Sequence, residues 1–139
     1  MRTKIFRILF IFILFVSCKK EESKNELLGN WYGFDSDSMY YELYISDTLI
    51  ILNHENLGIA EYTYLRDGQR LITTTPLFFE RIWDLESLND SSFTIKDTLE
   101  THHYKRLNIP AGFFESMNDS TGFFTFKEGF LERTQSHKQ

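Results

Sequence analysis

The fold class is decided by residues 39–46, Met39-Tyr40-Tyr41-Glu42-Leu43-Tyr44-Ile45-Ser46. In an extended chain successive side chains point to opposite faces, so Met39, Tyr41, Leu43 and Ile45 share one face. This alternation predicts a strand with one face packed inward and the other in water. From Leu27 onward, no window of eleven or more residues shows a convincing apolar stripe at helical spacing. We therefore expect an all-β domain.

Other short strand-like runs, bounded by turn residues, recur about every ten residues. Asp67-Gly68 separates two of them, and Asp-Gly favours a hairpin because glycine accepts the positive φ of such turns. Pro76 ends another run because proline cannot donate to a strand ladder. Eight candidate strands result, at residues 31–34, 39–45, 48–52, 59–64, 70–75, 78–85, 92–96 and 99–107. This spacing predicts an antiparallel barrel of about eight strands or a β-sandwich.

The segment after Pro110 is too aromatic for a disordered tail. It could form a last hairpin, or a short helix at Phe113 to Met117 followed by one strand. Its phenylalanines could cover an open sheet edge or bind a partner protein. Residues 134–139 are expected to fray. The phenylalanines in question are Phe113, Phe114, Phe123, Phe124, Phe126 and Phe130.

Residues 1–17 have the pattern of a secretory signal, with three basic residues followed by an apolar run from Ile8 to Val16. The stretch Phe15-Val16-Ser17-Cys18 resembles the lipobox of bacterial lipoproteins, with Phe15 in place of the usual aliphatic residue. The resemblance implies that the signal is cut before Cys18 and that Cys18 is acylated, which anchors the protein in a membrane. An ordinary signal peptide with a free cysteine is the alternative.

Residues 18–26 are charged and are expected to form a flexible tether to a domain at residues 27–133. The resemblance to lipoproteins implies a lipid-anchored protein of the cell envelope, at the outer membrane. Lys20 followed by two acidic residues also resembles a surface-export signal, with a solvated linker as the alternative. The periplasmic or surface-exposed face is therefore left open.

The motif Gly29-Asn30-Trp31 lies at the start of the first expected strand. Together with the Asp-Gly hairpin and the later stretch Arg81-Ile82-Trp83, it resembles lipocalins and the lipocalin-like domains of bacterial lipoproteins. The resemblance extends from Leu27 to about Arg106. It implies that Trp31 plugs the closed end of a barrel and that Arg106 packs over the indole, a contact that cation–π attraction favours. A sandwich with Trp31 as an ordinary core residue is the alternative.

A barrel of eight strands is just wide enough to be filled by side chains or to hold one small ligand. Aromatic residues with a polar tip suit a cavity wall, because they combine apolar bulk with a group that can orient a ligand. The alternative role of such residues is core packing. The candidates for the wall are Tyr41, Tyr62, Tyr64 and Trp83.

The sequence contains no convincing metal-binding or catalytic motif. His102 and His103 are adjacent and point to opposite faces of a strand, so they cannot share one ion. His54 has no ligand cluster at a suitable spacing, and the stretch from Asp35 to Ser38 suits a turn better than a calcium loop. No nucleophile elbow or phosphate loop is present. We expect no metal, no cofactor and no enzymatic activity.

Removal of the three basic residues before Cys18 leaves 12 basic and 20 acidic side chains, a net charge of −8. Such a chain is a poor nucleic-acid binder. The sequence favours a membrane-anchored lipocalin-like lipoprotein that binds a small hydrophobic or amphipathic ligand or serves as a small envelope module. The alternative is a protein-binding module, such as a periplasmic immunity protein or a subunit of a surface complex. Its acidic surface would attract a basic partner.

Overall fold

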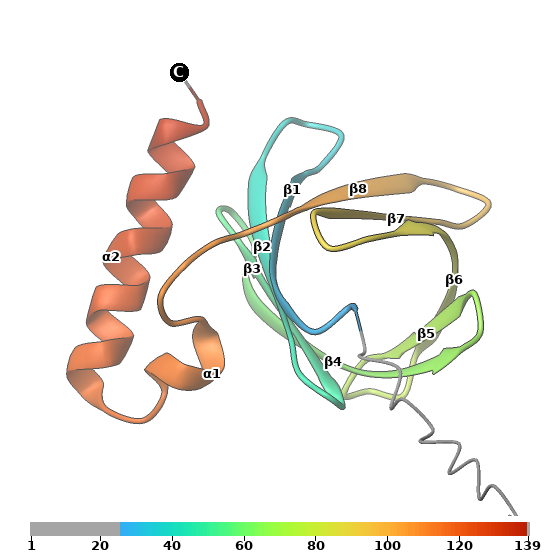
Figure 1. Cartoon of the computed structure of the whole chain (residues 1–139), viewed down its shortest axis with the longest axis horizontal. Helices are drawn as coiled ribbons and strands as arrows, with labels where there is room; N and C mark the ends of the chain where they lie inside the picture. Colours follow the sequence, from blue (N-terminus) through green and yellow to red (C-terminus); the bar gives the residue numbers. More distant parts are fainter. Residues whose placement is uncertain (1–25, 139) are drawn as a thin grey trace, which may run out of the picture.

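The computed structural model describes residues 26–138. The predicted signal peptide (1–17), the predicted lipidation site Cys18 and tether residues 19–25 lie outside the described residues. Eight strands are followed by two helices (Figure 1). The predicted strands are all present, with ends that differ by a few residues from those expected. They are β1(Gly29–Phe34), β2(Tyr40–Ile45), β3(Leu49–His54), β4(Gly58–Asp67), β5(Arg70–Thr74), β6(Glu80–Leu88), β7(Ser92–Lys96) and β8(Thr101–Arg106).

The eight strands form a closed barrel. Each strand pairs antiparallel with the next, and β8 pairs with β1 through Trp31–Arg106 and Tyr32–Lys105. The β4–β5 hairpin turns at the predicted Asp-Gly, where Gly68 has a φ of 60°. This is the up-and-down topology of lipocalins. The predicted barrel is confirmed, and the alternative β-sandwich is wrong because one closed sheet leaves no second sheet to pack on it.

Strand β2 is buried on both faces, although its alternation predicted one face in water. The inward side chains belong to the core of the barrel, and they are Tyr41, Leu43 and Ile45. The outward side chains are fully buried as well, and they are Tyr40, Glu42 and Tyr44. They are covered by the C-terminal helix, as shown by the ring of Phe126, 5.2 Å from that of Tyr44. The prediction failed because the alternation of side chains along a strand does not show whether the outer face meets water or a packed helix.

The C-terminal segment forms two helices, α1(Phe113–Ser116) and α2(Ser120–Ser136). Figure 1 shows α2 lying outside the barrel, on the side of β1, β2 and β3. The short helix expected near Phe113 is present, but the expected hairpin or strand after it is wrong. Asp119 caps the N-terminus of α2 by accepting a hydrogen bond from the backbone N–H of Gly122. Within residues 26–138, no helix has the length and apolar character needed to cross a bilayer.

The sequence missed α2 because its apolar stripe is narrow. Phe123, Phe126 and Phe130 follow one another at helical spacing, but Phe124 and Leu131 lie off this stripe, and most other positions hold glycine, polar or charged residues. The helix also includes Thr134, which is buried, whereas residues 134–139 were expected to fray. Beyond the helix, the ring of His137 stacks on Tyr40 at 5.0 Å. The chain therefore stays in contact with the barrel almost to its end.

A buried ion pair joins α2 to β2. Arg133 donates from Nε and Nη2 to the two carboxylate oxygens of Glu42, at 2.6 and 3.0 Å. Tyr40 donates its hydroxyl to the same carboxylate at 2.6 Å, and Tyr44 donates to it as well. Burial is the main cause that raises the pKa of both tyrosines, so they remain protonated donors. The Glu42 carboxylate is thus fully buried with four donors around it, which is the condition for a stable buried charge.

Candidate functional site

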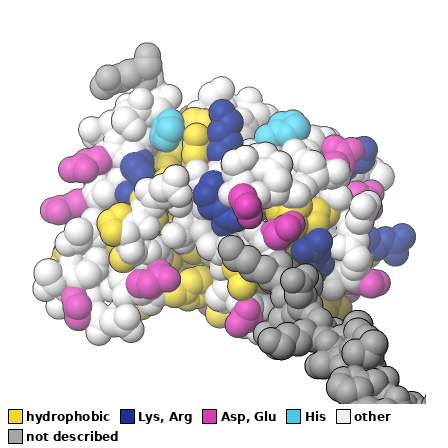
Figure 2. All heavy atoms as spheres, in the orientation of Figure 1, with side chains coloured by type: hydrophobic (Ala, Val, Ile, Leu, Met, Phe, Trp, Pro, Cys, Tyr) yellow, Lys and Arg dark blue, Asp and Glu magenta, His cyan; other side chains and the backbone are white. Residues whose placement is uncertain are grey.

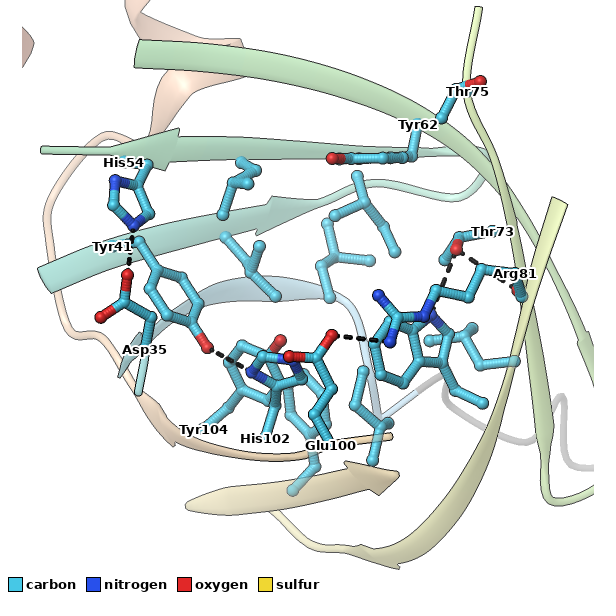
Figure 3. Close-up of a pocket in the computed structure, with 18 of the residues that line it drawn as sticks. Asp35, Tyr41, His54, Tyr62, Thr73, Thr75, Arg81, Glu100, His102 and Tyr104 are labelled. Carbon is cyan, nitrogen blue, oxygen red and sulfur yellow. Dashed lines mark hydrogen bonds and ion pairs between the residues drawn. The ribbon is translucent and has the colours of Figure 1, made fainter. Parts of the chain in front are cut away.

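The barrel encloses a cavity of about 550 Å³ that opens at one end (Figure 3). This lies within the range of roughly 300–1,000 Å³ typical of small-molecule sites. The inward positions of several strands supply its aliphatic lining, because alternate residues of a strand face the barrel interior. The interior is therefore not filled by side chains alone. The aliphatic lining residues on the strands are Leu43, Ile45, Ile50, Leu52, Leu71 and Ile95.

Trp31 and Arg106 meet at the other end of the barrel. The Trp31 ring is fully buried and lies edge-on to Phe93, a cavity-lining residue, with 4.7 Å between ring centroids. The guanidinium carbon of Arg106 lies 3.5 Å from the centroid of the Trp31 ring. Trp31 donates its indole N–H to the carbonyl of Leu27 at 2.8 Å, and Arg106 donates to the carbonyl of Leu28 at 2.7 Å. The structure thus places both residues where the resemblance to lipocalins implies a barrel floor.

Polar side chains gather at the open end, where four loops between paired strands come together. Asp35, in the β1–β2 loop, accepts a hydrogen bond from Nε2 of His54 at 3.0 Å. Nδ1 of His54 accepts the backbone N–H groups of Asn56 and Leu57, at 3.1 and 3.3 Å. Because Nδ1 accepts, the proton of His54 is on Nε2 and the ring is neutral. The backbone N–H of Met39 is the main cause that lowers the pKa of the Asp35 carboxyl.

A second polar network joins β6, the β7–β8 loop, β8 and β2 across the mouth of the cavity (Figure 3). Arg81 forms ion pairs with Asp97 at 2.5 Å and with Glu100 at 2.6 Å. Glu100 also contacts Nε2 of His102 at 3.2 Å. The other nitrogen of that ring, Nδ1, is 3.2 Å from the hydroxyl of Tyr41. A chain of polar groups therefore runs from Arg81 to the middle of the cavity wall.

Tyr41 is suited to donate a hydrogen bond. Burial raises its pKa to about 12, with a smaller contribution from the charges of Asp35 and Glu100. Burial also raises the pKa of Tyr104, which lies against Tyr41 with 5.8 Å between ring centroids. Both phenols are protonated at neutral pH. The chain from Glu100 through His102 to Tyr41 can orient a polar group of a ligand, but it does not generate a phenolate nucleophile.

Three of the four predicted wall residues line the cavity. Tyr41, Tyr62 and Trp83 do so, and the indole of Trp83 donates to the hydroxyl of Thr73 at 3.2 Å. Tyr64 is the exception. It faces inward nearer the closed end, where its hydroxyl donates to the carbonyl of Ser46 at 2.7 Å. Tyr64 packs against the barrel core and is not among the residues that line this cavity.

Sequence reasoning missed the charged side chains of the cavity mouth. Asp35 was interpreted as a turn residue, and its Oδ1 does accept the backbone N–H of Met39 in that turn. Its other oxygen, however, contacts His54 at the mouth. His102 could have been found from strand alternation, because it shares its face with Tyr104. Nothing in the sequence brings Arg81 and Glu100 together, since they belong to different strand–loop units.

Large apolar side chains are exposed around the mouth. We call this set the mouth collar, and each member is between 70% and 87% exposed. They extend from the loops that follow β3, β5 and β7, so they surround the entrance from three sides. Leu57 and Phe79 also line the cavity itself. The members of the mouth collar are Leu57, Leu77, Phe78, Phe79 and Leu99.

The C-terminal phenylalanines mostly cover the barrel. Phe126 and Phe130 are buried, whereas Phe124 is the exposed member of the set. Phe113 and Phe123 are half-buried and pack around Tyr44, on the outer face of the barrel, as does Phe114. Most of these rings therefore serve the fold, and the most exposed large apolar side chains of the described residues, each at 70% or more, are those at the mouth.

Charged side chains of both signs are mixed over the face seen in Figure 2. Such a face does not present the continuous basic patch that nucleic-acid binding needs. Among residues 26–138, no three His, Cys, Asp or Glu side chains are grouped so that they could hold a metal ion.

Comparison with known proteins yields one structural likeness to report. A lipocalin-like protein from Bacteroides uniformis, known from its crystal structure, aligns with a TM-score of 0.45 and 12% sequence identity. The alignment covers 59% of this chain and 99% of that chain. No protein-family model matches the sequence, and neither does any curated protein. This likeness is too weak to support a conclusion about fold or function. The assignment of a closed barrel rests on the strand pairing of the chain itself.

Proposed function

We propose that the protein binds a small amphipathic molecule in the barrel cavity, with its apolar part deep and its polar part at the mouth. The observation that carries this proposal is the graded lining of the cavity. Aliphatic side chains such as Ile50 and Leu71 line the deep part, and the polar networks of His54 and Glu100 lie at the open end. A mostly apolar cavity with a few polar groups is the usual form of a small-molecule site.

The protonated Tyr41 hydroxyl and the hydrogen-bonded His102 ring agree with a binding role without catalysis. The hydroxyl of Tyr41 keeps its proton at neutral pH, and His102 is held between that hydroxyl and Glu100. These groups can position a ligand through hydrogen bonds. We therefore propose a carrier or ligand-sensing role.

The test of ligand binding uses the uncharged fluorescent probe N-phenyl-1-naphthylamine. We expect saturable binding of one probe per chain, and loss of binding in Leu52→Trp, which fills the cavity. The matched control is Leu65→Trp, because Leu65 lies in the next strand and is 64% exposed on the outer face. Non-saturable binding, or equal binding by wild type and Leu52→Trp, would refute the proposal.

We also propose that Cys18 carries the lipid anchor and that the protein resides at the outer membrane. The support is the lipobox-like stretch from Phe15 to Cys18 and the signal-like run before it. In a bacterial host, labelled palmitate is expected to enter the wild-type protein but not Cys18→Ala. Equal labelling of the two proteins, or no labelling of either, would contradict this assignment.

The mouth collar favours a second candidate function, the binding of a partner protein. Exposed apolar groups of this size commonly mark interaction sites. Acidic side chains are exposed at the same end of the barrel, such as Asp37 in the β1–β2 loop and Glu80 at the start of β6, so the partner expected is one with an apolar and basic surface. A photo-crosslinking residue placed at position 78 in the intact envelope should yield one defined protein adduct, and the same residue at position 65 should not. Crosslinks to lipid alone would reject this candidate.

A further inference from the structure

The charged side chains that line the cavity are mostly acidic. The carboxylates of Asp35, Glu80 and Glu100 line the cavity, whereas Arg81 is the one Lys or Arg among the lining residues of the described chain. His54 adds no positive charge, because its Nδ1 accepts two backbone hydrogen bonds. The lining therefore carries a net negative charge, and that remains so even if His102 is protonated.

Arg81 is already engaged on several sides. Its guanidinium forms ion pairs with Asp97 and Glu100 and lies 4.0 Å from the centroid of the Trp83 ring. A ligand carboxylate would have to displace one of these two carboxylates and would meet the repulsion of the other. A fatty acid therefore finds no available cation at the mouth, and burying its charge there is unfavourable.

Aromatic rings lie beside the same carboxylates. Tyr41 and Tyr104 line the cavity next to His102, with ring centroids 6.4 and 6.2 Å from the imidazole. Aromatic faces attract cations, and quaternary ammonium groups are the ligands most often recognised in this way. Asp35 and Glu100 also contribute to the raised pKa of Tyr41, behind burial, so their negative field reaches the inner wall of the cavity.

We propose that the cavity selects amphiphiles with a cationic head group and disfavours those with a carboxylate head group. The inference rests on the proposed function, since it assumes that the apolar part of the ligand occupies the barrel. The head group would lie at the cavity mouth, near the carboxylates of Glu80 and Glu100, with the rings of Tyr41 and Tyr104 on the adjoining wall. Glu100 is partly exposed, with 43% of its side chain in contact with solvent, so the preference is moderated by solvent screening.

The test compares three amphiphiles with the same 12-carbon chain, dodecyltrimethylammonium, dodecyl maltoside and laurate. Each compound is titrated, below its critical micelle concentration, into the full chain with N-phenyl-1-naphthylamine bound, and displacement of the probe is measured. We expect dodecyltrimethylammonium to bind about tenfold more tightly than laurate, with the uncharged compound between them. The ratio should fall as sodium chloride is raised, because salt screens partly exposed charges.

Two variants test whether the preference for a cationic head group arises at the cavity mouth. Glu100→Gln and Glu80→Gln should each lower the ratio of cation to laurate affinity several-fold. Glu61→Gln is the matched control, because Glu61 is an exposed residue on the outer face of β4, and it should leave the ratio unchanged. Melting curves of all variants verify that the barrel is intact, and the use of two mouth variants keeps the test valid if one of them fails to fold.

The outcomes separate the two proposals. If none of the three amphiphiles displaces the probe, the proposed function fails together with the inference. If laurate binds as tightly as dodecyltrimethylammonium, or more tightly, the cavity is a ligand site but the inference is overturned. Equal effects of Glu100→Gln and Glu61→Gln would also overturn it, because the preference would then not arise at the mouth.

Discussion

Replacing Arg133 by methionine tests what holds α2 against the barrel. The change removes both hydrogen bonds from the guanidinium to Glu42 and leaves the carboxylate with the hydroxyls of Tyr40 and Tyr44 as donors. Methionine retains much of the volume of the arginine stem, so the loss is mainly one of charge. Glu42 stays fully buried in the variant, because β2 lies under the helix.

The expected loss follows from the contacts that disappear. A hydrogen bond to a charged group contributes about 1.5–3 kcal/mol, and two of them are lost. Removing one partner of a buried ion pair costs about 3–5 kcal/mol in proteins generally. The Arg133 side chain is 23% exposed, which favours the lower end. We therefore expect the free energy of unfolding to fall by about 3 kcal/mol, which lowers the Tm by roughly 10 °C.

The assay is urea unfolding followed by circular dichroism and tryptophan fluorescence. Lys127→Met is the control, because Lys127 is exposed on the same helix and its replacement should change stability by less than about 0.5 kcal/mol. Arg133→Lys should fall between wild type and Arg133→Met, since lysine keeps the charge but not the two-pronged geometry. A loss below about 1 kcal/mol in Arg133→Met would refute the argument that this ion pair secures α2.

Three further predictions concern the floor and the mouth of the barrel. Gly29→Ala should lower the free energy of unfolding by about 2 kcal/mol. Gly29 has a φ of 114°, and a Cβ there would lie 2.7 Å from Nη1 of Arg106. In a nuclear magnetic resonance titration, the Asp97 carboxyl should titrate near pH 2, since the backbone N–H of Leu99 is the main cause that lowers its pKa to about 2. Its contribution to stability is then complete above about pH 4 and is lost as the pH falls toward 2, and a midpoint near 4 would contradict this. Trp83→Phe should remove most of the change in tryptophan emission on ligand binding, while Trp31 still reports unfolding. An undiminished change would show that the ligand does not contact Trp83.

The strands and turns of the barrel could be predicted from the sequence because their signals are local. Alternation over residues 39–46 and the Asp67-Gly68 turn depend only on neighbouring residues. Trp31 and Arg106 were paired through the resemblance to lipocalins, and the structure places them in contact. Three of the four predicted wall residues, Tyr41, Tyr62 and Trp83, line the cavity, because aromatic character on an inward face could be seen in the sequence. Tyr64 shows the limit, because its position along the barrel axis depends on the register of the whole sheet.

The helix was the main element that the sequence did not determine. Residues 120–136 have only a narrow apolar stripe, so most of the stabilisation of α2 comes from packing on the barrel and from the buried Glu42–Arg133 pair. The two residues of that pair are 91 positions apart. A single sequence read locally cannot join them, and for this reason the outer face of β2 was predicted to meet water.

The sequence by itself determined the all-β class, the succession of strands and their turns, because these follow from the two-residue period of an extended chain and from the backbone preferences of glycine and proline. Closure of the barrel, the burial of β2 under α2, and the cavity mouth with Asp35, Arg81, Glu100 and His102 were decided only by the tertiary structure. Each of these depends on groups from separate hairpins meeting in space. Their contacts are set by strand register and packing over the whole barrel, which no local pattern encodes.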